Sequence, residues 1–181
     1  LLFLVQVIAV MLIYEFGQYW MHRFMHNNDL LWSTHAPHHH VTQLNALKGF
    51  IGNPIELFLI SLSILALLDF DGNAIFAGIF SLNAIALYAH ANIKSNPPSW
   101  FRFFFTTIRH HSLHLTALSY EDTRCNFGNA VSLWDRVFGT FKEGESEIVG
   151  QDDRRRLSIK EQWLFPITFF QQKRREQEPA E

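Results

Sequence analysis

Cysteine and an excess of charge are the two features that this sequence lacks most clearly. Cys125 is the only cysteine, so the chain closes no internal disulfide and carries no cysteine-based zinc motif. A single thiol is compatible with a reducing, cytosol-facing setting. The 15 basic and 17 acidic side chains nearly balance, so the net charge gives no support for a nucleic-acid partner.

Charge is especially scarce in the first half of the chain. Residues 1–93 carry seven charged side chains and residues 94–181 carry the other twenty-five. This division predicts a membrane part joined to an aqueous part. The chain starts on Leu1, with neither Met nor a basic stretch, which is unlike a signal peptide. We therefore expect the first helix to begin inside a longer apolar segment.

Three apolar runs predict the membrane part. Residues 1–14 lead into Tyr14, Tyr19 and Trp20, which are suited to the lipid–water interface. Residues 54–68 and 74–91 flank a turn at 69–73 and predict a hairpin of short or partly inserted helices. The alternative is a buried helical hairpin in a soluble protein.

The hairpin predicts which segments share a side of the membrane. It returns the chain to the side it left, so segments 22–40 and 90–114 would meet there. Lys and Arg are concentrated on that side, whereas the turn at 69–73 carries only acidic charge, so we expect the shared side to be cytoplasmic.

The later segments are shorter or more polar. Residues 100–105 are rich in aromatic side chains and predict an interfacial helix, or else part of a lipid channel. Residues 132–141 predict a short amphipathic helix that stops at Gly139. We expect 142–181 to be a polar extension whose end, 171–181, is a disordered, solvated tail.

All ten histidines fall in the two segments 22–40 and 90–114. The spacings H-x-x-x-H, H-x-x-H-H and H-x-x-H place rings on common helix faces. A single pair of this kind also occurs at membrane interfaces without binding a metal, but the whole set predicts metal binding. Structural zinc needs four ligands, so this many histidines favours two ions. An all-nitrogen site beside a lipid pocket suggests oxygen chemistry by iron on C–H bonds.

The ordered motifs resemble the fatty acid hydroxylase/sterol desaturase superfamily over about residues 10–141. The matching segments are Glu15 with Tyr19 to His26, Leu31 to His39, Asn45-Ala46-Leu47, Pro54-Ile55-Glu56, His90-Ala91-Asn92, His111 to His114, Asn126 to Asn129 and Trp134 to Thr140. The resemblance implies an integral membrane, non-haem di-iron enzyme that uses O₂. It also implies electrons from NAD(P)H, delivered by a separate reductase or small electron-transfer protein.

Carried over by position, the resemblance implies a set of metal ligands: His22, His26, His35, His38, His39, His90, His111 and His114. The chain departs from the family at Leu115, where a last histidine is usual, and at Glu15, where aspartate is usual. His110 is included as a ligand that could compensate for Leu115. His40 could do the same, but we expect it to lie behind the ligands or to face solvent.

Ligating histidines usually donate their second N–H to a carboxylate or carbonyl, and Glu15, Asp122 and Asp135 are the candidates for this role. Asp135 could instead cap a helix or form an ion pair near Arg136.

The sequence thus predicts an all-α fold of short membrane helices under a helical cytosolic cap, with a membrane di-iron domain at 1–141 and a polar extension at 142–181. The predicted function is hydroxylation or desaturation of a lipid C–H bond. The alternative is a non-catalytic zinc protein of the same fold. A metal transporter is disfavoured because the apolar hairpin lacks a path of embedded carboxylates or histidines.

Overall fold

The fold is a set of helices arranged around one long N-terminal helix. The structure, a computed structural model, describes residues 2–50, 52–117, 123–150 and 155–177. Within these ranges two isolated β-bridges occur and no strand, which confirms the predicted all-α class. In chain order the α-helices and 3₁₀ helices (η) are α1 (Leu2–Met25), α2 (Asp29–His39), η1 (Ala46–Phe50), α3 (Pro54–Ser61), η2 (Leu62–Leu67), α4 (Gly72–Ala89), α5 (Ser99–Phe104), α6 (Ile108–His114), α7 (Leu133–Val137) and α8 (Ile159–Gln177).

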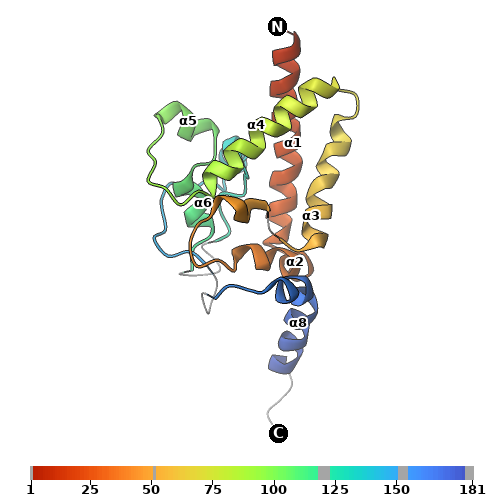
Figure 1. The fold of residues 1–181 in the computed structure, drawn as a ribbon, viewed down its shortest axis with the longest axis vertical. Coiled ribbons are helices and arrows are strands. Elements are labelled where there is room, and N and C mark those ends of the chain that lie inside the picture. The colour runs from red at the N-terminus through yellow and green to blue at the C-terminus, as the bar shows by residue number, and fades with distance from the viewer. Residues whose placement is uncertain (1, 51, 118–122, 151–154, 178–181) are drawn as a thin grey trace.

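The long helix α1 packs against both arms of the predicted hairpin. Helices α1 and α4 are long and apolar enough to cross a membrane, and α3 with η2 forms a shorter apolar segment at Pro54–Leu67. Figure 1 shows α4 crossing α1 obliquely and α3 lying alongside α1. The close approach of α1 and α4 requires Gly78, because a Cβ there would lie 2.7 Å from Val10 Cγ1.

Polar side chains fix both arms of the hairpin. Asp71 Oδ1 accepts hydrogen bonds from the backbone N–H groups of Asn73 and Ala74, so it caps the start of α4. On the other arm, Gln18 of α1 donates to Ile60 O at 2.7 Å and to Ser63 Oγ at 3.0 Å. These bonds hold α3 and η2 against α1.

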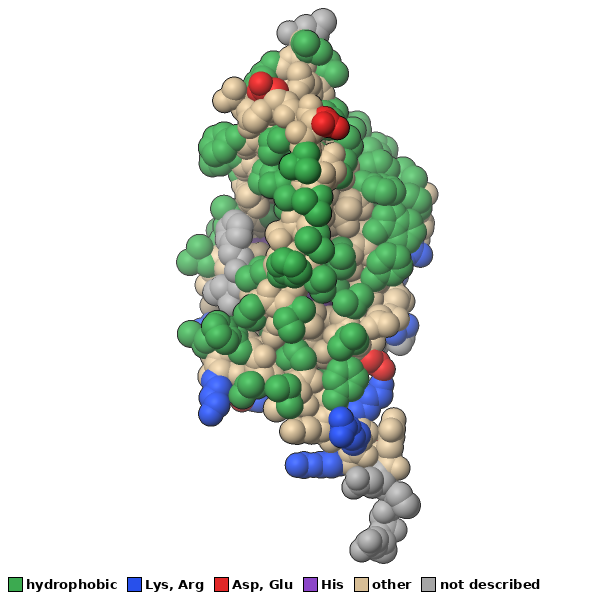
Figure 2. All heavy atoms as spheres, turned by 90° about the vertical axis from the view of Figure 1, so that its right-hand side faces the viewer, with side chains coloured by type: hydrophobic (Ala, Val, Ile, Leu, Met, Phe, Trp, Pro, Cys, Tyr) green, Lys and Arg blue, Asp and Glu red, His purple; other side chains and the backbone are tan. Residues whose placement is uncertain are grey.

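Basic side chains are concentrated toward one end of the surface, whereas exposed apolar side chains extend along most of its length. Figure 2 shows hydrophobic side chains from the upper to the lower part of the molecule, acidic side chains near its top, and Lys and Arg side chains mainly toward the C-terminal end. Phe58, Leu65, Phe76 and Phe80 are among the exposed apolar side chains of the hairpin. This distribution matches a membrane belt above a charged aqueous end.

The short helix α5 exposes Trp100, Phe103 and Phe104, as an interfacial helix would. Helix α7 ends just before Gly139, whose φ of 72° lies in the left-handed region that favours glycine. The assignment of α5 to a membrane interface stays a prediction.

The C-terminal segment differs from the expected disordered tail, since residues 171–177 continue α8. This helix is ordered because it packs against α2: the His40 and Phe165 rings lie 5.2 Å apart, and Lys173 pairs with Asp29. Asn53 also donates to Gln162 O at 2.9 Å. The division at residue 141 stays a prediction, and residues 178–181 lie outside the described residues.

Candidate metal centre

Eight buried histidines form two groups between the lower ends of α1, α2, α4 and α6. In each group, one ring nitrogen from every member lies within 4.8 Å of the others. The five-histidine group consists of His22, His26, His35, His39 and His114, and the three-histidine group of His38, His90 and His111. Segments 22–39 and 90–114, separated by the apolar hairpin, therefore meet as their predicted topology requires.

Helical spacing explains how the rings are divided. His22 and His26 lie four residues apart on α1, and His35 and His39 do so on α2, so each pair presents its rings on one face. His38 lies on the neighbouring face of α2 and joins the second group. The C-cap position of α4 supplies His90, and α6 supplies one ring to each group.

The distances between ring nitrogens are those of ligands around a common ion. His22 Nε2 and His39 Nε2 lie 3.0 and 3.1 Å from His35 Nε2. In the second group, His90 Nε2 lies 2.8 Å from His111 Nε2 and 3.3 Å from His38 Nε2. Two nitrogens bound at 2.0–2.1 Å to one ion, at tetrahedral or octahedral angles, lie about 2.8–3.4 Å apart.

Backbone carbonyls fix the tautomers of three of these rings. The Nδ1 atoms of His22, His114 and His90 donate to Phe127 O at 2.6 Å, Cys125 O at 2.7 Å and Ala86 O at 2.8 Å. A carbonyl only accepts, so in each neutral ring Nε2 keeps its lone pair.

These inward lone pairs form a set of acceptors that a cation can bind. His114 Nε2 is buried and forms no hydrogen bond with any described residue. His22 Nε2 likewise presents its lone pair at 3.0 Å from another ring nitrogen. A bound metal ion would satisfy these acceptors, so the residues present fit a metal.

Burial keeps the rings in the form that binds metals. It lowers the pKa of His90 to about 4 and that of His35 to about 3, and it holds the pKa values of His39, His111 and His114 well below their usual range. The rings are thus neutral at physiological pH, and neutral imidazole is the metal-binding form.

The carboxylate that contacts a histidine of the two groups is Glu56, which the sequence motifs did not assign to the site. Its Oε1 lies 2.5 Å from His35 Nδ1, and both side chains are buried. The signal was a lone acid in the first turn of an apolar run, within the Pro54-Ile55-Glu56 motif. Gly52 gives the carboxylate its space, because a Cβ there would lie 2.4 Å from Glu56 Oε2.

Glu15 and Asp135 were expected to accept from ligating histidines, but each accepts from backbone N–H groups instead. Glu15 accepts from the N–H groups of Ala130 and Val131, both at 2.9 Å. Asp135 accepts from the N–H groups of Phe127 and Gly128 at 2.7 and 2.8 Å.

In the described part of the chain, neither acid has a hydrogen bond to a histidine ring. They hold the loop whose Phe127 carbonyl accepts from His22, so their influence on the site is indirect. Asp122 lies outside the described residues.

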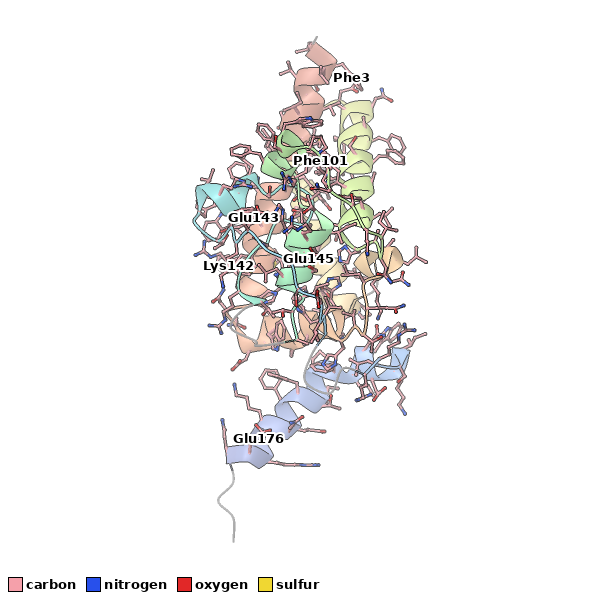
Figure 3. All side chains as sticks on the ribbon, turned by 90° about the vertical axis from the view of Figure 1, so that its left-hand side faces the viewer. Phe3, Phe101, Lys142, Glu143, Glu145 and Glu176 are labelled. Atoms are coloured by element: carbon pink, nitrogen blue, oxygen red, sulfur yellow. The ribbon has the colours of Figure 1, made fainter. Side chains whose placement is uncertain are left out.

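Two other predicted positions lie apart from the groups. His110 Nε2 lies 3.3 Å from Glu143 Oε2, and its ring packs on Phe141. In Figure 3, Glu143 and Glu145 come from the loop beside α6, and Glu145 pairs with Arg109 at 3.2 Å. Leu115 is buried in an aliphatic cluster with Val41 and Val149. The three-histidine group therefore has no fourth histidine among the described residues.

A cavity of about 180 Å³ extends from the histidines into the hairpin. Its apolar walls come from α3 (Leu57 and Ile60) and α4 (Leu82, Ala86 and Leu87), and its inner end reaches His22, His35, His38 and His90. None of the described α5 side chains lines this cavity, so the aromatic residues at 100–105 do not form its walls. The cavity thus connects apolar side chains of the hairpin with both histidine groups.

Comparison with known proteins gives a consistent set of matches. The family model for fatty acid hydroxylase matches residues 7–140. The chain is 32% identical over 139 residues to ornithine lipid hydroxylase OlsE from Rhizobium tropici, covering 75% of this chain and 41% of that protein. It is 29% identical over 150 residues to sphinganine C4-monooxygenase 2 from Arabidopsis thaliana, covering 75% and 54%.

The human alkylglycerol monooxygenase is 23% identical over 136 residues, covering 75% of this chain and 30% of that protein. The chain thus spans about a third to a half of the length of these relatives. No solved structure matches the chain.

Proposed function

Because the chain belongs to the fatty acid hydroxylase family, we propose that it is a membrane-bound oxidoreductase that hydroxylates or desaturates a lipid C–H bond at a non-haem di-iron centre. The observation that carries this proposal is the convergence of eight buried, neutral histidines in two groups at the end of an apolar cavity. Iron ions bound there would activate O₂ and supply the oxidising power that an unactivated C–H bond requires.

The two groups suit different roles. Five histidines surround the first position, whereas His38, His90 and His111 leave coordination positions open at the second. Sites with three protein ligands are typical of catalytic metals, because open positions admit a substrate or solvent molecule. Carbonyls and Glu56 hold the rings by their second nitrogens, which orients them before the ion binds.

The cavity positions the substrate and excludes water. Its walls of Leu57, Ile60, Leu82 and Leu87 favour an alkyl chain, and its inner end lies against His35 and His90. An alkyl chain that fills this space displaces solvent from the histidine groups, which protects the oxidising site from side reactions.

The distribution of charge suggests the orientation and the partner. The histidines lie at the end of the hairpin opposite the acidic turn at 69–73, on the side where Lys and Arg are concentrated. We place this end in the cytoplasm, where a reductase or small electron-transfer protein would deliver electrons from NAD(P)H.

The test combines metal analysis with lipid analysis. Purified chain reconstituted with iron should hold two ions, and cells that express it should accumulate lipids heavier by one oxygen or lighter by two hydrogens. His39→Ala should abolish both results, whereas His40→Ala should not, because His40 packs against Phe165 outside the groups. Fewer than two ions per wild-type chain, or unchanged lipids, would refute the proposal.

A second candidate function is a non-catalytic protein that holds zinc. It is favoured by Leu115, which packs among aliphatic side chains at the position where a ligand was expected. The substitution Leu115→His discriminates between the two functions. Lipid oxidation gained only in this variant would indicate a decayed centre, whereas oxidation already present in the wild type would exclude the zinc function.

A further inference from the structure

Asn83 is an unusual side chain for its place in the fold. It lies in the C-terminal half of α4, an apolar helix long enough to span a membrane. The residue is exposed, lines the cavity, and forms no side-chain hydrogen bond with any described residue. An amide in an apolar setting costs free energy unless it is hydrogen-bonded, and polar residues inside membrane helices commonly mark binding sites.

The neighbouring polar side chains do not satisfy this amide. Gln18 donates to Ile60 O and Ser63 Oγ and accepts from Asn129 Nδ2 at 3.1 Å. Glu15 accepts from two backbone N–H groups. Gln18 and Glu15 on the α1 side of the cavity are thus engaged with protein, whereas the Asn83 amide on the α4 side is available to a ligand.

A second unpartnered group lies near the histidines. Glu56 is 4% exposed, lines the same cavity, and its Oε2 is buried without a hydrogen-bond partner among the described residues. The cavity is therefore apolar along its walls, with a polar group on α4 and another beside His35. A plain hydrocarbon chain would leave both groups unsatisfied, which disfavours it as the ligand.

We propose that Asn83 determines substrate specificity by binding a hydrogen-bonding group, such as a hydroxyl or amide, on the lipid substrate. The proposal rests on the lipid-oxidising function given above. His90 follows Asn83 by seven positions, which is about 10 Å along the α4 axis at 1.5 Å per residue. A polar group held by Asn83 thus leaves several methylene groups to reach the histidines.

The experiment compares the binding of 1-hexadecanol and hexadecane to the zinc-loaded full chain in detergent micelles. Binding is measured as displacement of a fluorescent acyl probe. The variants are Asn83→Leu, Asn83→Ala and the control Asn73→Leu, which makes the same change on α4 outside the cavity. Zinc content and melting temperature establish that each variant is folded.

We expect the wild type and Asn73→Leu to bind the alcohol roughly five- to thirty-fold more tightly than the alkane, as one hydrogen bond in an apolar site allows. Both Asn83 variants should lose this preference and keep their affinity for the alkane. An alcohol preference that survives in either folded Asn83 variant, or is absent from the wild type, would overturn the proposal.

This assay needs neither iron nor O₂, so it separates the two proposals. Loss of the alcohol preference at Asn83 without any lipid oxidation by the iron-loaded wild type would support the binding role and refute the enzymatic function. Lipid oxidation by the iron-loaded wild type, together with an alcohol preference that is unchanged in the Asn83 variants, would support the enzymatic function and refute the binding role.

Discussion

Replacing Glu56 by glutamine tests how strongly a carboxylate outside the histidine groups controls metal binding. The substitution keeps the size of the side chain and removes its ability to carry a negative charge. In the native chain Glu56 Oε1 lies 2.5 Å from His35 Nδ1, and the two side chains are 5% and 4% exposed. Bulk solvent therefore does not compete for this contact in the native chain.

Two independent magnitudes agree on the size of the effect. With a metal ion bound to His35, a hydrogen bond to the ionised carboxylate would contribute about 1.5–3 kcal/mol. Removing the partner of a ligating histidine lowers metal affinity by roughly 10- to 100-fold, which corresponds to about 1.4–2.7 kcal/mol. We expect Glu56→Gln to fall near the lower value, since the amide oxygen can still accept from His35, and Glu56→Ala near the upper value.

Competition between the purified chain and a chelator for zinc measures this affinity directly. Glu147→Gln makes the same chemical change at an exposed position and should leave the affinity unchanged. Gly52→Ala provides a second perturbation, because its Cβ would lie 2.4 Å from Glu56 Oε2 and would push the carboxylate aside. Native affinity in Glu56→Ala, or an equal loss in Glu147→Gln, would refute the reasoning.

Three further predictions concern stability. Gly78→Ala should destabilise the chain by about 1–3 kcal/mol, because the new Cβ would lie 2.7 Å from Val10 Cγ1. Gly72→Ala is the control, since a Cβ there meets nothing within 4 Å. Equal melting temperatures for the two variants would contradict this prediction. Asp135→Asn should cost a similar amount, since the carboxylate accepts from two buried N–H groups, and Asp69→Asn at an exposed position serves as its control in denaturant titrations. The metal-free chain should lose stability as pH falls below 6.5, where the unfolded histidines gain protons while His90 stays neutral down to about 4. Each such histidine costs about 2 kcal/mol at pH 5, and a flat stability between pH 7 and 5 would exclude this burial effect.

Helical periodicity made much of the centre predictable. The intervals between His22 and His26 and between His35 and His39 fix which rings share a helix face, whatever the helices pack against. The apolar runs on either side of the turn at 69–73 predicted that the chain returns to its starting side, and so that His90 and His111 meet the earlier histidines. These are local properties, set by spacing and by burial of apolar surface.

Hydrogen-bond partners were not predictable in the same way. The carboxylate that contacts His35 is Glu56, whereas the sequence pointed to Glu15 and Asp135. The direction of α3 decides which carboxylate reaches His35. The ordered end of α8 had a similar origin, since its polar composition alone favoured a solvated tail but packing on α2 keeps it helical.

The sequence by itself determined that this protein is helical, that it carries apolar segments of membrane length, and that its histidines converge, because residue type and spacing encode these features locally. Only the tertiary structure decided the division into groups of five and three, the exclusion of His110 and Leu115 from them, and the cavity that places Asn83 on a path to His90. The physical reason is that these features depend on how helices far apart in the chain cross and on which side chains that crossing leaves without a partner.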